Sequence, residues 1–314
     1  MNWDRVERLI GPGNLDALRR KRVAIIGLGS GGGFIALALA MSGVGSFLLM
    51  DDDTLEETNI VRHVADRRYL GWNKADAVAD LIHQRNAAAS VTIVKGRLEA
   101  NLDALDGCDL VVSGLDGEGS KYILNQACLE RRLTVVYAGV YERGEGGDVC
   151  LIHPYDGPCY ACWAGELREG IADRRASDEV LDYGMIGPEG TLEAEPGLWL
   201  HVTRIASVQA DMALNELLRD SEIYRAQPGN TVVLANVALE IVDGQTSFPY
   251  SSIWATIDRD PDCLVCGPHY HQQEQGDTFS LQRLMENTGI VVESEVEAAH
   301  DAEADGEAPA PAGA

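Results

Sequence analysis

Residues 21–53 read KRVAIIGLGSGGGFIALALAMSGVGSFLLMDDD and carry the strongest structural signal in this chain. An apolar run at residues 23–26 leads directly into the glycine-rich turn GLGSGG at residues 27–32. A proline-free apolar segment follows at residues 34–41, and a second apolar run at residues 47–50 ends on Asp51. This order predicts a strand, a tight turn, a helix and a second strand that ends on a carboxylate.

The glycines of the turn have the G-x-G-x-x-G spacing that is typical of nucleotide-binding turns. Gly27 permits the tight turn, Gly29 lets the backbone approach a phosphate, and Gly32 allows the helix to pack closely on the strand. The first N–H groups of the helix are free to bind an anion. Asp51 follows Gly27 by 24 residues, near the separation expected of a carboxylate that binds a ribose hydroxyl. The motif alone does not distinguish NAD, FAD and ATP, and a turn that only packs is the alternative.

The rest of the chain alternates strand-like and helix-like segments. After the first unit we expect helices at residues 73–86, 120–132 and 198–218, a short strand at residues 91–94, and buried strands at residues 109–113 and 134–138. Further strands are expected at residues 146–153, 231–242 and 252–257. The sequence therefore predicts an α/β fold, with a doubly wound, mostly parallel Rossmann-like sheet and an antiparallel C-terminal extension.

The polarity of the chain divides it into one domain and a tail. We expect a single domain over residues 1–267 and an extension over residues 268–314, acidic and disordered from about residue 293. Residues 164–197 are polar and poorly periodic, which predicts a long loop, and loops of that length are usually functional.

Composition and charge exclude several classes of protein. The chain is 46% hydrophobic, has no apolar run of membrane-spanning length and does not begin like a signal peptide, so we expect a cytoplasmic protein. Its formal net charge of −25 argues against nucleic acid as the main partner.

Four of the seven cysteines form two C-x-x-C pairs, Cys159 with Cys162 and Cys263 with Cys266. In a cytoplasmic chain such pairs indicate a metal rather than disulfides, and together they can supply the four thiolates of a structural zinc site. A redox pair would open a helix in a thioredoxin-like unit, which is not expected here. The remaining cysteines are expected to be small buried hydrophobic residues: Cys108, Cys128 and Cys150.

The residues after Asp51 match the motifs of one known protein family. Residues 51–63 read DDDTLEETNIVRH, Lys74 follows, and Asp116 ends a later predicted strand. These motifs resemble those of the ThiF/MoeB/HesA family, bacterial relatives of ubiquitin-activating enzymes: G-x-G-x-x-G, D-x-D-x-V-x-x-S-N-L-x-R-Q, a lysine on the next helix, a T-D-N step and two C-x-x-C pairs. The resemblance covers roughly residues 1–267, and the segment Trp3-Asp4-Arg5 resembles the family's Y-[DN]-R. The other matched positions are Gly27, Gly29, Gly32, Asp51, Asp53, Asn59, Arg62, Lys74 and Asp116.

The resemblance implies an ATP-dependent adenylyltransferase that joins AMP to a carboxylate and releases pyrophosphate. The nucleophile is already ionised at neutral pH, so the reaction needs cations rather than a general base. By resemblance Asp51 would bind the ribose and Asn59 would position the phosphates, with Asp53 and the three glycines also on the nucleotide. Arg62 and Lys74 would neutralise phosphate oxygens, and Asp116 would bind Mg²⁺.

The resemblance also implies partners. The substrate would be the C-terminal carboxylate of a ubiquitin-like or sulfur-carrier protein ending in Gly-Gly. The protein would be a homodimer in which Arg5 reaches into the partner's site. In the family the loop at residues 164–197 crosses the site, and relatives that form thioesters place a cysteine there or in a separate domain. This loop contains no cysteine, so we expect no obligatory enzyme thioester.

The sequence departs from the family pattern in one motif. The T-D-N step reads Leu115-Asp116-Gly117, and Lys121 stands where an arginine is common. These changes favour a slower step or a different substrate. A peptide terminus or a carboxylate on a modified tRNA base is therefore an alternative, although the acidic surface argues against tRNA. A non-catalytic adaptor is another. An NAD-dependent oxidoreductase would explain the glycine turn but would leave Arg62 and Lys74 without a role.

Each residue also has a simpler interpretation. Arg62 and Lys74 could be surface charges, and Asp116 could cap a helix. His63 stands where the family commonly has glutamine, and it could contact phosphate or cap the loop.

Overall fold

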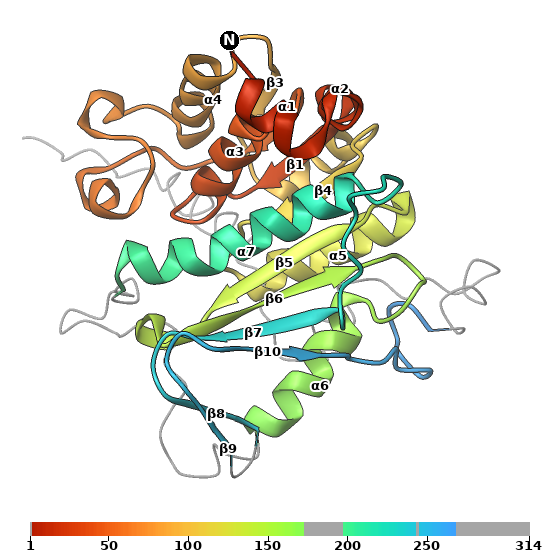
Figure 1. The fold of residues 1–314 in the computed structure, drawn as a ribbon. Helices are drawn as coiled ribbons and strands as arrows, with labels where there is room; N and C mark the ends of the chain where they lie inside the picture. The colour runs from red at the N-terminus through yellow and green to blue at the C-terminus, as the bar shows by residue number, and fades with distance from the viewer. Residues whose placement is uncertain (1, 173–196, 243–244, 268–314) are drawn as a thin grey trace, which may run out of the picture. The chain divides into compact units, whose positions relative to one another are not determined.

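The computed structural model describes residues 2–172, 197–242 and 245–267. Its main feature is an eight-stranded sheet with the order β10-β7-β6-β5-β4-β1-β2-β3 (Figure 1). The parallel part consists of β1 (Arg22–Ile26), β2 (Ser46–Met50), β3 (Ser90–Val94), β4 (Leu110–Ser113) and β5 (Val135–Val140). The strand order 3-2-1-4-5 reverses between β1 and β4, which is where doubly wound sheets bind ligands.

The antiparallel extension is present as predicted. β6 (Gly146–Ile152) pairs with β5, β7 (Thr231–Ala235) with β6, and β10 (Ser252–Ala255) with β7. The predicted strand at residues 231–242 ends earlier than expected, because the chain leaves the sheet after β7. It then forms a separate hairpin of β8 (Leu239–Val242) and β9 (Gln245–Ser247).

Two hydrophobic cores hold the helices on opposite faces of the sheet. The first contains buried residues of α3 (Gly32–Met41), α4 (Lys74–Arg85) and α7 (Trp199–Leu217), and α7 lies across β5 and β6 (Figure 1). The second contains residues of α5 (Glu118–Arg131) and α6 (Tyr160–Ala172). Because both faces are covered, β1 and β2 are buried along nearly their whole length, which explains their continuous apolar sequence.

Short helices complete the described chain. The N-terminal segment forms α1 (Asp4–Ile10) and α2 (Pro12–Arg20), which are separated at Gly11, whose φ of 85° is left-handed. Pro12 can begin α2 because the first helical N–H has no intrahelical partner. The 3₁₀ helices are η1 (Glu57–Arg62), η2 (Arg67–Tyr69), η3 (Leu98–Ala100), η4 (Leu102–Leu105) and η5 (Glu142–Gly144).

The prediction of a loop over residues 164–197 is wrong for residues 164–172, which are helical. α6 continues to Ala172, with the backbone helical throughout. Trp163 and Ala164 are buried in the second core, so tertiary packing stabilises a helix that the glycines at 165 and 170 disfavour. Residues 173–196 lie outside the described residues, as does the tail predicted to be disordered. No helix in the described part of the chain is long and apolar enough to cross a membrane.

Candidate active site

The glycine turn lies at the reversal point of the sheet, where the ends of β1 and β4 meet. Gly27 has a φ of 83°, and a Cβ at this position would lie 2.7 Å from the carbonyl oxygen of Gly114. A Cβ on Gly32 would lie 1.9 Å from the carbonyl oxygen of Gly27, so α3 packs directly on the turn. These are the conformational and packing reasons predicted for the two glycines. A Cβ on Gly29 would meet no atom within 4 Å, so the turn is open at this position.

Asp51 is bonded to the turn and to the segment that follows β2. One carboxylate oxygen accepts a 2.6 Å hydrogen bond from the N–H of Leu28, and the other accepts a 2.8 Å bond from the N–H of Asp53. Burial raises the pKa of Asp51, and the two N–H donors oppose that rise. A carboxylate has about four lone-pair positions, so Asp51 can still accept hydrogen bonds from a ribose.

Lys74 is held beside the same segment. Its ammonium lies 2.5 Å from a carboxylate oxygen of Asp53, and only 12% of its side chain is exposed. Lys74 begins α4, whose N-cap Asn73 donates to the main-chain carbonyls of Asp51 and Asp53 and accepts from the N–H of Ala75. The surface-charge interpretation therefore does not fit Lys74. Its ammonium is mostly buried and positioned, and two of its three donor positions can still bind a phosphate.

Asn59 and Arg62 lie on η1, which follows β2. The side-chain oxygen of Asn59 accepts from the N–H of Glu56, which closes a capping box at the start of η1. Arg62 is partly buried, and it forms no ion pair with any residue that the structure describes. The guanidinium is therefore free to bind an anion.

Asp116 follows β4 at the same edge of the sheet. The N-cap of α5 is Gly117 rather than Asp116, so the alternative in which Asp116 caps this helix is not supported. The Asp116 carboxylate is exposed and has no hydrogen-bond partner in the described ranges. Exposed carboxylate oxygens suit a hard cation such as Mg²⁺. The carboxylates of Asp51, Asp52 and Asp53 also lie within 4.8 Å of one another, but Asp51 is already bonded to the turn and Asp53 to Lys74.

His63 is hydrogen-bonded to the glycine turn. Its Nε2 lies 2.7 Å from the carbonyl oxygen of Leu28, and the N–H of Ala65 donates to its Nδ1 over 3.0 Å. Because Nδ1 accepts a hydrogen bond, the proton lies on Nε2, which donates to Leu28. Burial lowers the pKa of His63, in agreement with a neutral ring. Of the two roles left open for His63, the structure supports the loop cap.

Lys121 stands where the family commonly has an arginine, and the sequence did not predict its surroundings. It is 6% exposed and forms a 3.2 Å ion pair with Glu118 on α5. The buried carboxyl of Asp148 lies in the field of this lysine, and Tyr141 donates to it. Desolvation nevertheless raises the pKa of Asp148 to about 6. The sequence did not indicate the burial of Lys121, because the acid whose charge it faces, Asp148, lies on β6, far along the chain.

The two cysteine pairs come together at the start of α6. The Sγ atoms lie 3.7 Å apart for Cys159 and Cys162, 3.8 Å for Cys159 and Cys263, and 3.5 Å for Cys162 and Cys266. A tetrahedral zinc ion with Zn–S bonds of about 2.3 Å would separate its sulfur ligands by about 3.8 Å. All four side chains are buried, so their geometry and chemistry fit a closed structural zinc site.

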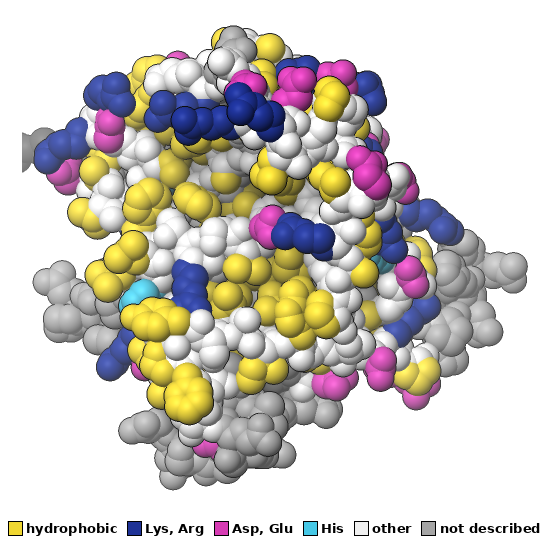
Figure 2. Space-filling model, viewed as in Figure 1, with side chains coloured by type: hydrophobic (Ala, Val, Ile, Leu, Met, Phe, Trp, Pro, Cys, Tyr) yellow, Lys and Arg dark blue, Asp and Glu magenta, His cyan; other side chains and the backbone are white. Residues whose placement is uncertain are grey.

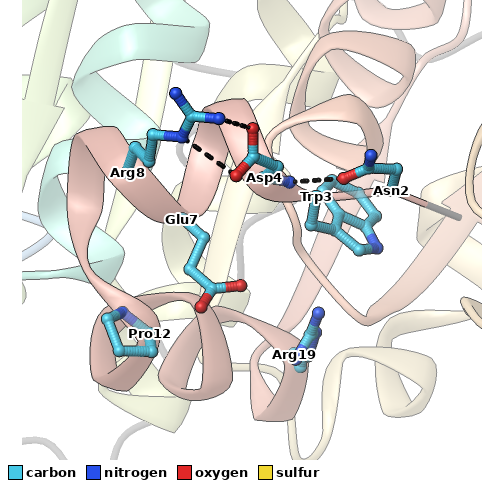
Figure 3. A pocket seen from close by; sticks show the side chains of 7 residues that line it. All are labelled: Asn2, Trp3, Asp4, Glu7, Arg8, Pro12 and Arg19. Carbon is cyan, nitrogen blue, oxygen red and sulfur yellow. Dashed lines mark hydrogen bonds and ion pairs between the residues drawn. The ribbon is translucent and has the colours of Figure 1, made fainter.

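Arg5 lies on the N-terminal helix α1 (Asp4–Ile10) and is exposed. Figure 2 shows Lys and Arg side chains near the top of the view, in the region of α1 and α2. A surface hollow of about 670 Å³ lies there (Figure 3), lined by Asn2, Trp3, Asp4, Glu7, Arg8, Pro12 and Arg19. Arg8 pairs with Asp4 one turn away along α1, whereas Arg5 is exposed and forms no ion pair among the described residues.

Comparisons with known proteins agree with this architecture. A model of the ThiF family matches residues 4–248. The SAMP-activating enzyme E1 of Haloferax volcanii is 29% identical over 266 residues, covering 82% of this chain and 84% of that protein. The adenylyltransferase and sulfurtransferase UBA4 of Yarrowia lipolytica is 31% identical over 152 residues, but this chain spans only 38% of its length.

Among solved structures, E. coli MccB with ATP aligns with a TM-score of 0.61 at 20% identity, covering 85% of this chain and 75% of that one. The structure of MccB in complex with N-formylated MccA gives a TM-score of 0.62 at 20% identity and covers 85% of this chain and 76% of that chain. At this identity the likeness concerns the fold alone, which is the Rossmann-like sheet predicted from the sequence.

Proposed function

This chain belongs to the ThiF family, whose named relatives are adenylyltransferases and activating enzymes, and we propose that it adenylates the C-terminal carboxylate of a ubiquitin-like or sulfur-carrier protein ending in Gly-Gly. The observation that carries the proposal is one connected set of hydrogen bonds at the reversal point of the sheet. Leu28 of the turn is bonded to Asp51, Asp51 to Asp53, and Asp53 to Lys74. A ribose acceptor, an open phosphate turn and a positioned cation are thereby held together.

The reaction that this site would support needs no proton transfer. A carboxylate oxygen of the carrier attacks the α-phosphorus of ATP, a new P–O bond forms, and the bond to the β-phosphate oxygen breaks. Pyrophosphate leaves with the electron pair of that bond. Lys74 and Arg62 would neutralise the phosphate oxygens during this step, and Asn59 would orient them. Mg²⁺ held by Asp116 would supply further neutralisation of the leaving pyrophosphate.

Burial of the cysteines supports a product released as the adenylate. Four cysteines form the candidate zinc site, and the other three are at most 7% exposed: Cys108, Cys128 and Cys150. Burial raises the pKa of Cys108 and Cys150, and that of Cys128 to about 12. A thioester needs an accessible thiolate, which none of these three residues offers. A carrier conjugate that forms on one of them and is released by a reducing thiol would contradict this part of the proposal.

ATP–pyrophosphate exchange tests the function directly. Exchange should appear only with ATP, Mg²⁺ and a carrier protein, and a carrier lacking its terminal Gly-Gly should not support it. Asp116→Ala should abolish exchange, whereas Asp52→Ala, which removes an exposed neighbouring carboxylate, should not. Exchange supported by a short peptide but by no carrier would favour the peptide-terminus alternative. No exchange and no ATP binding would favour the adaptor.

The proposed role of Arg5 in a homodimer can be tested by mixing two inactive variants. Arg5→Ala and Asp116→Ala protomers should each be inactive as homodimers. In a mixed dimer, one site would combine the intact Arg5 of one protomer with the intact Asp116 of the other. Recovered exchange after mixing would support action across the dimer, and a monomeric protein in light scattering would contradict it.

A further inference from the structure

The glycine turn is contacted by α7, which comes from a distant part of the chain. The indole Nε1 of Trp199 donates a 3.1 Å hydrogen bond to the carbonyl oxygen of Ser30, across 169 residues of sequence. A Cβ on Gly31 would lie 3.7 Å from the Cβ of Ala206 and 3.8 Å from a methyl group of Val202. The first turns of α7 therefore lie directly against the turn, and Trp199 makes the polar contact.

Two carbonyl groups of the turn are thus bonded to side chains. His63 donates to the carbonyl of Leu28 over 2.7 Å, and Trp199 donates to that of Ser30. In a planar trans peptide the C=O of one residue and the N–H of the next point in opposite directions. Binding these carbonyls therefore directs the N–H of Gly29 and the N–H of Gly31 away from His63 and Trp199.

Those two N–H groups have no acceptor in the part of the chain that the structure describes. At Gly29 the turn is also open, since a Cβ there would meet nothing within 4 Å. Main-chain N–H groups that point out of a turn beside a helix N-terminus attract anions. Whether the turn can bind an anion therefore depends on the direction of its peptide planes as well as on the absence of side chains.

We propose that Trp199 is a positioning residue for the nucleotide phosphates, with His63 making the equivalent contact to the carbonyl of Leu28. This inference rests on the proposed function, because it assumes that the turn receives ATP. Trp199 acts through the peptide plane between Ser30 and Gly31 and touches no reacting atom. It should therefore affect the binding of phosphates and leave the binding of the nucleoside to Asp51 unchanged.

Binding of ATP and of adenosine to the full chain separates these effects. Trp199→Phe keeps an aromatic ring but removes the N–H donor. It should weaken ATP binding about tenfold, as expected for misdirecting a hydrogen bond to a charged group, and change adenosine binding less than twofold. Trp254→Phe is the matched control. It makes the same change on β10, at the opposite end of the sheet from the β1–β3 side, and should change neither value.

His63 provides a second route if Trp199→Phe does not fold. His63→Leu removes the donor to Leu28 and should weaken ATP binding more than adenosine binding. His63→Gln supplies an amide donor and should recover most of the ATP affinity. Equal losses for ATP and adenosine in Trp199→Phe, or no loss for ATP, would overturn this inference alone. Absence of ATP binding by the unchanged protein would overturn the proposed function as well.

Discussion

The main-chain N–H of Leu28 donates a 2.6 Å hydrogen bond to the carboxylate of Asp51. This bond joins the turn that would receive the phosphates to the acid that would receive the ribose. Asp51 therefore holds the first residues of the turn in place, and a change at Asp51 should be detected in the stability of the fold as well as in binding.

Asp51→Asn tests this dependence. An asparagine has one side-chain oxygen, so it can accept from Leu28 or from Asp53 while its NH₂ group faces the other N–H donor. We expect the free energy of unfolding to fall by about 1 to 3 kcal/mol and adenosine binding to weaken. Urea unfolding and adenosine titration would measure the two effects. Asp52→Asn, at an exposed position, is the control, and equal stability of the two variants would contradict the prediction.

Two glycines of the turn should respond differently to alanine. The Cβ of Gly32→Ala would lie 1.9 Å from a main-chain oxygen, so the backbone must shift, and we expect a loss of about 3 kcal/mol in unfolding free energy. The Cβ of Gly29→Ala would meet no atom, so its stability should change by less than about 1 kcal/mol. Its ATP affinity should nevertheless fall, because the new methyl group would occupy the space proposed for phosphate. Normal ATP binding by a stable Gly29→Ala protein would place the phosphates elsewhere.

Zinc should be required for the stability of the described domain. Cys263→Ser and Cys159→Ser should each reduce bound zinc from one ion per chain towards none and lower the thermal midpoint, since a structural zinc site contributes folding free energy. Metal analysis and thermal melts, with and without a strong chelator, would check this. Cys108→Ser changes a cysteine outside the cluster and should leave the zinc content intact. A zinc content unaffected by Cys263→Ser would refute the assignment.

The buried carboxyl of Asp148 should give stability a measurable pH dependence. Its folded pKa is raised by desolvation to about 6 from an ordinary value of 3.8, so the folded state binds the proton more tightly than the unfolded state. The stability that this group contributes is complete below pH 4 and is lost as the pH rises through 6. The loss approaches about 3 kcal/mol at neutral pH.

Asp148→Asn removes that titration. The stability difference between variant and parent should be small near pH 4 and should grow in favour of the variant up to about pH 7. Urea unfolding at several pH values would measure it, with Asp52→Asn again as the control. A difference that does not vary with pH would show that Lys121 keeps Asp148 ionised in both states.

The parts of the fold that were predictable are those encoded by short segments. The apolar runs that form β1 and β2 are buried on both faces, so their composition indicated a parallel sheet. The spacing from Gly27 to Gly32 encodes a local turn, and the two C-x-x-C pairs predicted the cluster of four thiols that the structure brings together.

The parts that were not predictable depend on residues far apart in the sequence. The bond from Trp199 to Ser30 spans 169 residues, and nothing near either residue indicates it. His63 could be placed at the site but not assigned a role, because its partner is a main-chain carbonyl. The helix over residues 164–172 was missed because the glycines at 165 and 170 lower its local preference for a helix, whereas the helix starts on residues buried in the second core, Trp163 and Ala164.

Zinc bound at the cysteine cluster would also affect how the chain reaches this fold. Cys159 and Cys263 are 104 residues apart. The segment between them includes α7, β7 and β10. Bringing the ends of so long a segment together costs chain entropy before any packing compensates for it, which slows folding. A denatured chain that retains zinc on its thiolates begins with this loop already closed. Refolding from the metal-bound denatured state should therefore be faster than refolding from the metal-free state.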